Sequence, residues 1–212
     1  RFARAYMGKL WIFVNNSGLY KIDMSTFKIE GHYTLLTDYE GNSLRTFYID
    51  KKGYIWFGTI DGIYIFDPTD GKLSHYKHSR TDPFSLPNNS IWEISEDRQS
   101  NVWIGTYSGT LCYVNIDENN AFKTYHPQNS GLNHTPVSAF AEDQQYLWVG
   151  TEGGGINRMN KATGEFSYIT SANSITSNNI KSLITDAGHN LWISTFMGGL
   201  DLYNVGRQKV TH

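Results

Sequence analysis

The sequence contains little of what several common protein classes require. Its 212 residues include one cysteine, Cys112, so no disulfide can form within the chain. Lys and Arg number 18 against 20 Asp and Glu, and a formal net charge of -2 provides no basic field for nucleic acid or an anionic membrane. No apolar run approaches the roughly 18 residues that a membrane-spanning helix needs. We therefore expect no nucleic-acid partner and no membrane contact by this segment.

Motifs for catalysis and cofactors are also missing. The sequence has no serine nucleophile elbow, no cysteine pair and no glycine-rich phosphate loop ahead of a helix. His75 and His78 are three residues apart at the end of an expected strand, where they point to opposite faces, so we expect no metal site. We predict no catalytic residue and no cofactor. The chain also lacks a signal peptide and begins inside a repeat, which favours a segment of a larger protein.

What the chain does have is a tryptophan that recurs every 44 to 47 residues. The anchors are Trp11, Trp56, Trp103, Trp148 and Trp192. The last four stand in a shared pattern of apolar residue, Trp, apolar residue, Gly or Ser, and Thr. Between them lie short runs of β-branched and aromatic residues, without a sustained 3.6-residue period. A period near 45 in a chain of strands indicates a radial or stacked array.

Each repeat is predicted to form four short strands in an antiparallel meander, which is one blade of a β-propeller. In the third repeat the predicted strands cover residues 90–97, 102–106, 111–116 and 122–126. The predicted fold is therefore all-β, with residues 1–212 forming a β-propeller segment. About five blades are expected, at residues 1–37, 44–77, 90–126, 136–170 and 179–212.

Columns that stay constant across the repeats have structural explanations. An Asp stands five or six residues before each of the last four anchors, where it is predicted to bind backbone N–H groups of a hairpin turn. A glycine three residues after the threonine is predicted to adopt a positive φ in the next turn. These glycines are Gly62, Gly109, Gly154 and Gly198. The anchor tryptophans themselves are predicted to pack between blades.

The repeat resembles that of the two-component regulator propeller family. The resemblance rests on Asp, then (Leu/Ile/Val)-Trp-(Ile/Val/Phe)-Gly-Thr, then Gly-Gly-(Leu/Ile) and a Thr-Gly-Glu-Phe turn. The clearest copy covers residues 143–158 and continues at residues 163–166. The resemblance extends over essentially the whole chain, with repeats two to five matching best.

This resemblance implies a seven-bladed propeller of which about five blades are present. In this family such propellers form the periplasmic sensor region of hybrid two-component histidine kinases in Bacteroides-like bacteria, as part of an inner-membrane protein. The implied function is detection of a glycan fragment and relay of the signal to a kinase outside this chain, so that the segment itself is not an enzyme. The implied partners are an oligosaccharide, other propeller blades or a second sensor subunit.

Columns that vary between repeats are the candidates for binding, because a rigid scaffold commonly carries recognition residues on its loops. The second residue of each predicted inner strand varies, as do the residues that follow the conserved threonine. An extra tryptophan beside basic residues can stack on a sugar ring and bind its hydroxyl or carboxylate groups. The candidate ligand-binding residues are Trp92, Arg45, Lys181, Tyr107, Phe196, Asp61 and Glu152.

Each candidate also has a structural explanation. Trp92 can pack between blades, Tyr107 and Phe196 can close the upper edge of a blade, and Arg45 and Lys181 can be solvated charges. Two further functions stay open at this point. Asp61 and Glu152 are a potential carboxylate pair for glycosidic chemistry in a lyase-like enzyme, although they belong to blades two apart. Alternatively, the blades serve as a non-catalytic scaffold for protein interactions.

Overall fold

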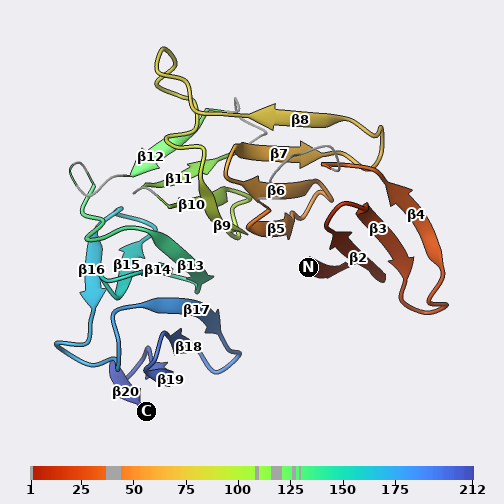
Figure 1. Cartoon of the computed structure of the whole chain (residues 1–212). Coiled ribbons are helices and arrows are strands. Elements are labelled where there is room, and N and C mark those ends of the chain that lie inside the picture. Colours follow the sequence, from red (N-terminus) through yellow and green to blue (C-terminus); the bar gives the residue numbers. More distant parts are fainter. Residues whose placement is uncertain (1, 37–43, 108–109, 116–120, 126–127, 129) are drawn as a thin grey trace.

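The computed structural model describes all residues except 1, 37–43, 108–109, 116–120, 126–127 and 129. Within this part the chain forms twenty strands and no helix. The strands make five four-stranded sheets, in which consecutive strands pair antiparallel (Figure 1). The predicted all-β propeller architecture is confirmed. The described part accordingly contains no helix with the length and apolar character that spanning a membrane takes.

Each sheet coincides with one sequence repeat, and we number the blades in chain order. Blade 1 contains β1 (Phe2–Tyr6), β2 (Lys9–Val14), β3 (Gly18–Asp23) and β4 (Ile29–Tyr33). Blade 2 contains β5 (Thr46–Ile49), β6 (Ile55–Thr59), β7 (Gly62–Phe66) and β8 (Leu73–Tyr76). Blade 3 contains β9 (Ile91–Glu96), β10 (Val102–Thr106), β11 (Leu111–Val114) and β12 (Lys123–Tyr125). Blade 4 contains β13 (Val137–Glu142), β14 (Tyr146–Thr151), β15 (Ile156–Asn160) and β16 (Phe166–Ile169). Blade 5 contains β17 (Ile180–Thr185), β18 (Asn190–Thr195), β19 (Gly199–Asn204) and β20 (Lys209–Thr211).

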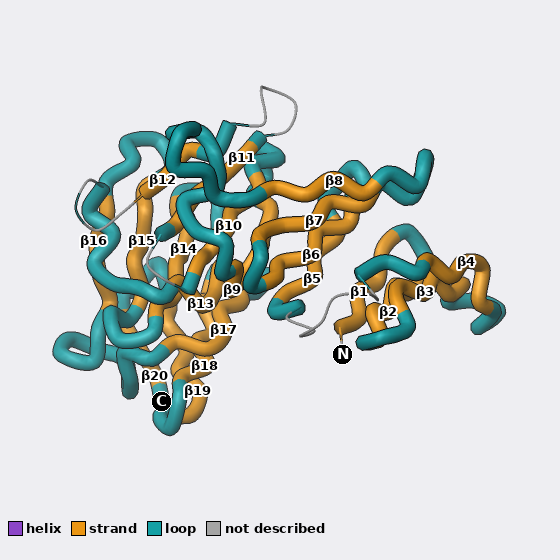
Figure 2. The backbone as a smooth tube through the Cα atoms, turned by 45° about the horizontal axis from the view of Figure 1, so that its top comes forward, coloured by secondary structure: helices purple, strands orange, loops and turns teal. Residues whose placement is uncertain are grey.

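The four strands predicted for the third repeat are present as β9 to β12. The structure ends the third strand at Val114, and the predicted ends of the last two strands, residues 116 and 126, lie outside the described residues. Figure 2 shows that strands make up most of every blade and that loops join the blades.

The first strand of each blade lies on the inner side of the arrangement. Neighbouring blades contact one another through these strands, β1 with β5, β5 with β9, β9 with β13, and β13 with β17. The five blades follow an arc with blades 1 and 5 at its two ends (Figure 1). The second residues of the inner strands are therefore close to the concave side, where blades meet.

The hydrophobic core is divided into clusters that lie between successive blades. Trp11, Trp56, Trp103 and Trp148 each belong to the cluster shared with the following blade, and none is more than 4% exposed. The packing predicted for these anchors is confirmed. Trp192 differs, because its side of blade 5 is open and the residue is 38% exposed.

The conserved aspartate binds both its turn and the anchor tryptophan. Asp50 Oδ1 accepts hydrogen bonds from the backbone N–H groups of Lys52 and Tyr54, as predicted from its position in the turn. Its Oδ2 also accepts the indole Nε1–H of Trp56 at 2.8 Å. The same indole bond measures 2.8 Å in blade 3, 2.9 Å in blade 4 and 3.0 Å in blade 5. In each of these blades the conserved aspartate therefore holds together the hairpin turn and the anchor tryptophan.

The glycine two residues after the anchor tryptophan is needed because the next blade packs directly against it. A Cβ on Gly58 would lie 2.7 Å from a methyl carbon of Ile91, and one on Gly105 would lie 2.9 Å from the carbonyl oxygen of Val137. The inner strand of the following blade therefore passes too close for a side chain. In blade 5 the equivalent residue is Ser194, on the open side of the sheet.

The prediction of a positive φ three residues after the threonine is right in blade 2 and wrong in blades 4 and 5. Gly62 has a φ of 105°, whereas the positive φ values fall on Gly153 and Gly155 rather than Gly154. They fall on Met197 and Gly199 rather than Gly198. The reason is loop length, because Thr59 binds the carbonyl three residues on, but Thr151 and Thr195 bind the one four residues on. Gly109 lies outside the described residues.

Candidate functional site

The variable second residue of the inner strand coincides with a β-bulge in three blades. Trp92, Ser138 and Lys181 are each the extra residue at which the register with the second strand shifts. A bulge bends the strand locally and redirects the side chain that it carries. In blade 2 the equivalent Arg45 directly precedes β5, and its N–H binds the carbonyl of Gly58 at 2.8 Å. In blades 3, 4 and 5 the position that varies between repeats therefore lies on a bulge that redirects its side chain.

Three of the predicted residues meet where blades 2 and 3 adjoin. The guanidinium carbon of Arg45 lies 4.9 Å from the ring centre of Trp92 and 5.8 Å from that of Tyr107. The two rings are 5.3 Å apart, with an interplanar angle of 31°. Tyr107 is 51% exposed and Trp92 lies outside the buried clusters between the blades. We call these three residues the aromatic cluster.

Three other predicted residues meet between blades 4 and 5. The ammonium group of Lys181 binds the carboxylate of Glu152, and it lies 5.4 Å from the ring centre of Phe196. Phe196 is 53% exposed. Ser138 is the equivalent bulged residue of blade 4. It is buried and its hydroxyl donates to the carbonyl of Ile180, so this bulge has a structural role.

Asp61 does not join either group. Its carboxylate lies 2.6 Å from the Lys77 ammonium, and its carbonyl accepts a hydrogen bond from His75 Nε2 at 2.7 Å. Asp61 in blade 2 thus pairs with Lys77, and Glu152 in blade 4 pairs with Lys181 of blade 5.

Glu93 is a residue of this region that the sequence analysis missed. It follows Trp92 in β9, and its Oε1 accepts a hydrogen bond from the Thr46 hydroxyl at 3.3 Å. Burial raises the pKa of Glu93 to about 7, against a weaker opposing effect of its hydrogen bond with the backbone of Ile94. The available signal was that Glu93 is the one charged residue in the third position of the aligned inner strands. Glu93 therefore lies next to Trp92 in the sequence of β9, with its carboxyl bound to Thr46 of blade 2.

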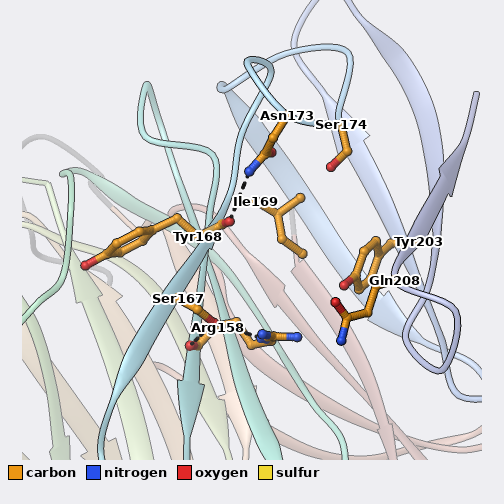
Figure 3. Close-up of a pocket in the computed structure, with 8 residues that line it drawn as sticks. All are labelled: Arg158, Ser167, Tyr168, Ile169, Asn173, Ser174, Tyr203 and Gln208. Atoms are coloured by element: carbon orange, nitrogen blue, oxygen red, sulfur yellow. Dashed lines mark hydrogen bonds between the residues drawn. The ribbon is translucent and has the colours of Figure 1, made fainter.

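A separate small cavity opens at the outer edge between blades 4 and 5 (Figure 3). Its volume is about 250 Å³ and its lining is mainly polar. Nε of Arg158 donates to the Ser167 hydroxyl at 2.8 Å, and the guanidinium lies 4.7 Å from the Tyr146 ring centre. None of the seven predicted binding residues lines this cavity. Its arginine already has partners, so we do not assign it a ligand.

Groups suited to metal binding or nucleophilic chemistry are scarce in the described part of the chain. No set of three or more His, Cys, Asp or Glu side chains there is arranged to hold a metal ion. Cys112 is buried, and desolvation raises the pKa of its thiol well above the ordinary range. A thiol that stays protonated is a poor nucleophile.

A family model for the two-component regulator propeller matches residues 38–61, 85–108 and 131–153. Each matched segment contains an inner strand and the tryptophan strand that follows it. The chain carries two-component regulator propeller repeats. The three matches include the variable position of the inner strand and the anchor tryptophan in blades 2, 3 and 4. The resemblance noted in the sequence is therefore confirmed.

Relatives of these propeller repeats occur in longer proteins. Histidine kinase P4 of Formosa agariphila is 28% identical, over 84% of this chain and 14% of its own length. The extracellular domain of the putative hybrid two-component system BT3049 from B. thetaiotaomicron superimposes with a TM-score of 0.77 and 22% identity. That match covers 99% of this chain and 29% of the other. PorZ of Porphyromonas gingivalis, a surface component of the type-IX secretion system, gives a TM-score of 0.52 at 14% identity, over 98% of this chain and 38% of its own. These structural likenesses establish the fold.

Proposed function

We propose that this chain is part of the periplasmic sensor region of a hybrid two-component receptor, where it detects a glycan fragment. The observation that carries the proposal is the aromatic cluster on redirected backbone between blades 2 and 3. The propeller repeats, and the histidine kinase among the relatives, support the receptor context. The kinase, its membrane anchor and its signalling partners belong to the complete protein.

The chemistry of the aromatic cluster suits a sugar. An indole or phenol ring offers a flat apolar face to the C–H groups of a pyranose, and a guanidinium donates several hydrogen bonds to hydroxyl or carboxylate oxygens. Trp92 and Tyr107 provide the rings and Arg45 the donors. The carboxyl of Glu93 lies next in the strand and adds an acceptor above its pKa of about 7.

The position of the cluster suits a sensor. Arg45 belongs to blade 2, whereas Trp92 and Tyr107 belong to blade 3, so a ligand held by all three spans a contact between blades. A ligand shifts a conformational equilibrium by the difference between its affinities for the two states. Contacts across a blade boundary offer such a difference without any catalytic group.

We also propose that a further propeller blade covers the open side of blade 5. The corresponding sides of blades 1 to 4 are each packed against the next blade. The open side presents Ile184, Trp192 and Leu200, which are 62%, 38% and 54% exposed. An apolar sheet face of this kind is typical of an interface.

The glycan proposal is tested with the complete protein that carries this chain. Its affinity for a panel of neutral and acidic oligosaccharides is measured by calorimetry, in parallel with Trp92→Ala and Arg45→Gln variants. Phe27→Ala removes an aromatic side chain that is 82% exposed in blade 1 and serves as the matched control. We expect the first two variants to weaken binding at least tenfold, about 1.4 kcal/mol, and the control to bind normally.

Equal binding by Trp92→Ala and the unmodified protein would show that the aromatic cluster is not the glycan site. Absence of binding across the whole panel would contradict direct glycan sensing. Release of unsaturated sugar products from an acidic polysaccharide would instead support a lyase.

A further inference from the structure

Arg45 is a basic residue without an acidic partner in the part of the chain that the structure describes. Its side chain is exposed, and its guanidinium lies over Trp92 and Tyr107 without forming an ion pair to any described Asp or Glu. At the equivalent position of blade 5, Lys181 pairs with the carboxylate of Glu152. Of these two cations at equivalent positions, the one in blade 5 is neutralised and the one in blade 2 is not.

Glu93, the acid next in sequence to the aromatic cluster, does not supply the missing partner. Its Oε1 accepts the hydroxyl of Thr46 at 3.3 Å. Burial raises the pKa of this carboxyl to about 7, and the positive charge that opposes the rise belongs to Arg4 of blade 1. The guanidinium of Arg45 is therefore available to an anion that a ligand brings.

Backbone hydrogen bonds fix the loops that carry the cluster. The N–H of Tyr107 donates to the carbonyl of Ser90, just before β9, at 2.8 Å. The N–H of Gly62 donates to the carbonyl of Asn89, also at 2.8 Å, and thereby joins blade 2 to the segment that leads into blade 3. A site whose groups are held in place before binding loses less entropy when the ligand arrives.

The closeness of the guanidinium to both rings limits which saccharides suit the cluster. Its carbon lies within 5.8 Å of both ring centres, so a sugar that contacts the rings also removes water from the charge. Removing water from a charge is costly unless an opposite charge compensates it. A neutral sugar offers only hydroxyl groups, whereas the two oxygens of a carboxylate match the planar fork of a guanidinium.

We propose that the aromatic cluster selects saccharides that carry a carboxylate, and that Arg45 determines this selectivity. The selectivity rests on the proposed glycan-binding function and restricts its ligand to glycans that contain a uronic acid. The carboxylate pairs with the guanidinium, while Trp92 and Tyr107 contact the C–H groups of the sugar ring. A neutral glycan of the same shape leaves the guanidinium without a counter-charge and binds more weakly.

The test uses pairs of oligosaccharides that differ only in the carboxylate. The complete protein that carries this chain is titrated calorimetrically with tetrasaccharides of galacturonate, glucuronate or mannuronate. Each is compared with its carboxyl-reduced counterpart, in which a primary alcohol replaces the carboxylate. We expect a uronate tetrasaccharide to bind roughly tenfold or more tightly than its reduced counterpart, because a hydrogen bond to a charged group is stronger than a neutral one. High salt should diminish this preference.

Variants assign the preference to one side chain. Arg45→Gln should bind the acidic and the reduced tetrasaccharide equally. Arg45→Lys keeps the charge but loses the planar fork, and should retain a smaller preference than the unmodified protein. Arg207→Gln removes an exposed arginine from the turn before β20 in blade 5, and as the matched control it should keep the full preference. Trp92→Ala should weaken binding of both members of a pair by the same factor.

Equal affinity of the unmodified protein for the two members of every pair would overturn the selectivity. Glycan binding at the cluster would still stand in that case if Trp92→Ala weakened it. A full preference in Arg45→Gln would also overturn the proposal, because the carboxylate would then be recognised elsewhere. Tighter binding of a sulfated galactose tetrasaccharide than of any uronate would overturn the choice of carboxylate. Absence of binding by every saccharide would refute the selectivity and the glycan-binding function together.

Discussion

Blades 4 and 5 carry the same anchor residue in different surroundings. The indole of Trp148 binds Asp143 and that of Trp192 binds Asp186, at 2.9 and 3.0 Å. Trp148 is fully buried against blade 5, whereas Trp192 is 38% exposed. The comparison shows that blade 5 forms its sheet and its Asp–Trp bond without a blade packed on its open side, but that such a blade is needed to bury the anchor.

The difference extends across the whole open side of blade 5. Ile184 pairs with Trp192 in the β17–β18 register, so the two side chains lie on the same face. Ser194 stands in the position where blades 2 to 4 require glycine, and Leu200 lies opposite it. A sheet face without a neighbour tolerates larger or polar residues where a covered face does not.

The largest expected effect comes from removing the two anchors. Trp148→Ala should lower the free energy of unfolding of the full chain by about 3–5 kcal/mol, since it removes a buried aromatic side chain. Trp192→Ala should cost about 1–2 kcal/mol, because much of its surface is already in solvent. Urea unfolding followed by circular dichroism measures both. Equal losses would contradict the comparison, and a larger loss for Trp192→Ala in the complete protein would indicate that another blade covers it.

The next effect concerns the glycine column. Gly105→Ala should destabilise the chain by about 1–3 kcal/mol, because the new methyl group meets the backbone of Val137 and has no room to move. Ser194→Ala, at the equivalent position of blade 5, should change stability by about 0.5 kcal/mol or less. Thermal unfolding of both variants would sharpen the comparison. A neutral Gly105→Ala would show that the blades can separate to admit a side chain.

The third effect depends on pH. It compares a buried inner-strand residue, Glu93 in blade 3, with the exposed residue at the same position in blade 5. The pKa of Glu93 is raised to about 7 from an unfolded value of 4.5, so the folded state binds this proton more tightly. The proton on Glu93 therefore stabilises the folded state fully below pH 4.5, and this stabilisation is lost as the pH rises through 7. Glu93→Gln should stabilise the chain by about 2 kcal/mol at pH 8 and hardly at all at pH 4.

Ser182 occupies the position of Glu93 in blade 5, where the side chain is exposed. A Ser182→Glu variant should show no such loss of stability between pH 4.5 and 7, which stability curves at several pH values can test. Glu93→Gln with the same pH dependence as the unmodified chain would contradict the raised pKa.

The smallest effect compares two ion pairs. Lys161 binds Glu142 at 2.5 Å in blade 4, and the two side chains are 15% and 14% exposed. Lys181 binds Glu152, with exposures of 43% and 24%. Lys161→Gln should cost about 1–2 kcal/mol, whereas Lys181→Gln should cost about 0.5 kcal/mol or less and lose even this in high salt. Denaturant unfolding at two salt concentrations measures the difference, and a reversed order would contradict it.

Much of the fold was predictable because its information is local and repeated. The anchors and their flanking apolar residues specify strands, and five copies in phase specify blades. The same internal alignment pointed to Arg45, Trp92 and Tyr107, which the structure brings together. The alignment could not reveal that Trp92 sits on a bulge, since a bulge depends on the register between two strands.

The remaining features depend on how each hairpin folds back on itself and on how the blades pack together. The bond from Trp56 to Asp50 requires the ring to fold back over its own hairpin, and the raised pKa of Glu93 requires burial by blade 2. Sequence reasoning also placed the positive φ of blades 4 and 5 one residue away from its actual positions, because it assumed equal loop lengths.

The sequence by itself determined the number of blades, the strands in each and the residues that vary on a constant scaffold, because neighbours along the chain encode strand periodicity. Tertiary structure alone decided which anchors are buried and which charges are paired. Those properties arise from how closely one sheet packs on the next. The repeat therefore makes five similar blades, and their packing makes Trp192 differ from the other anchor tryptophans.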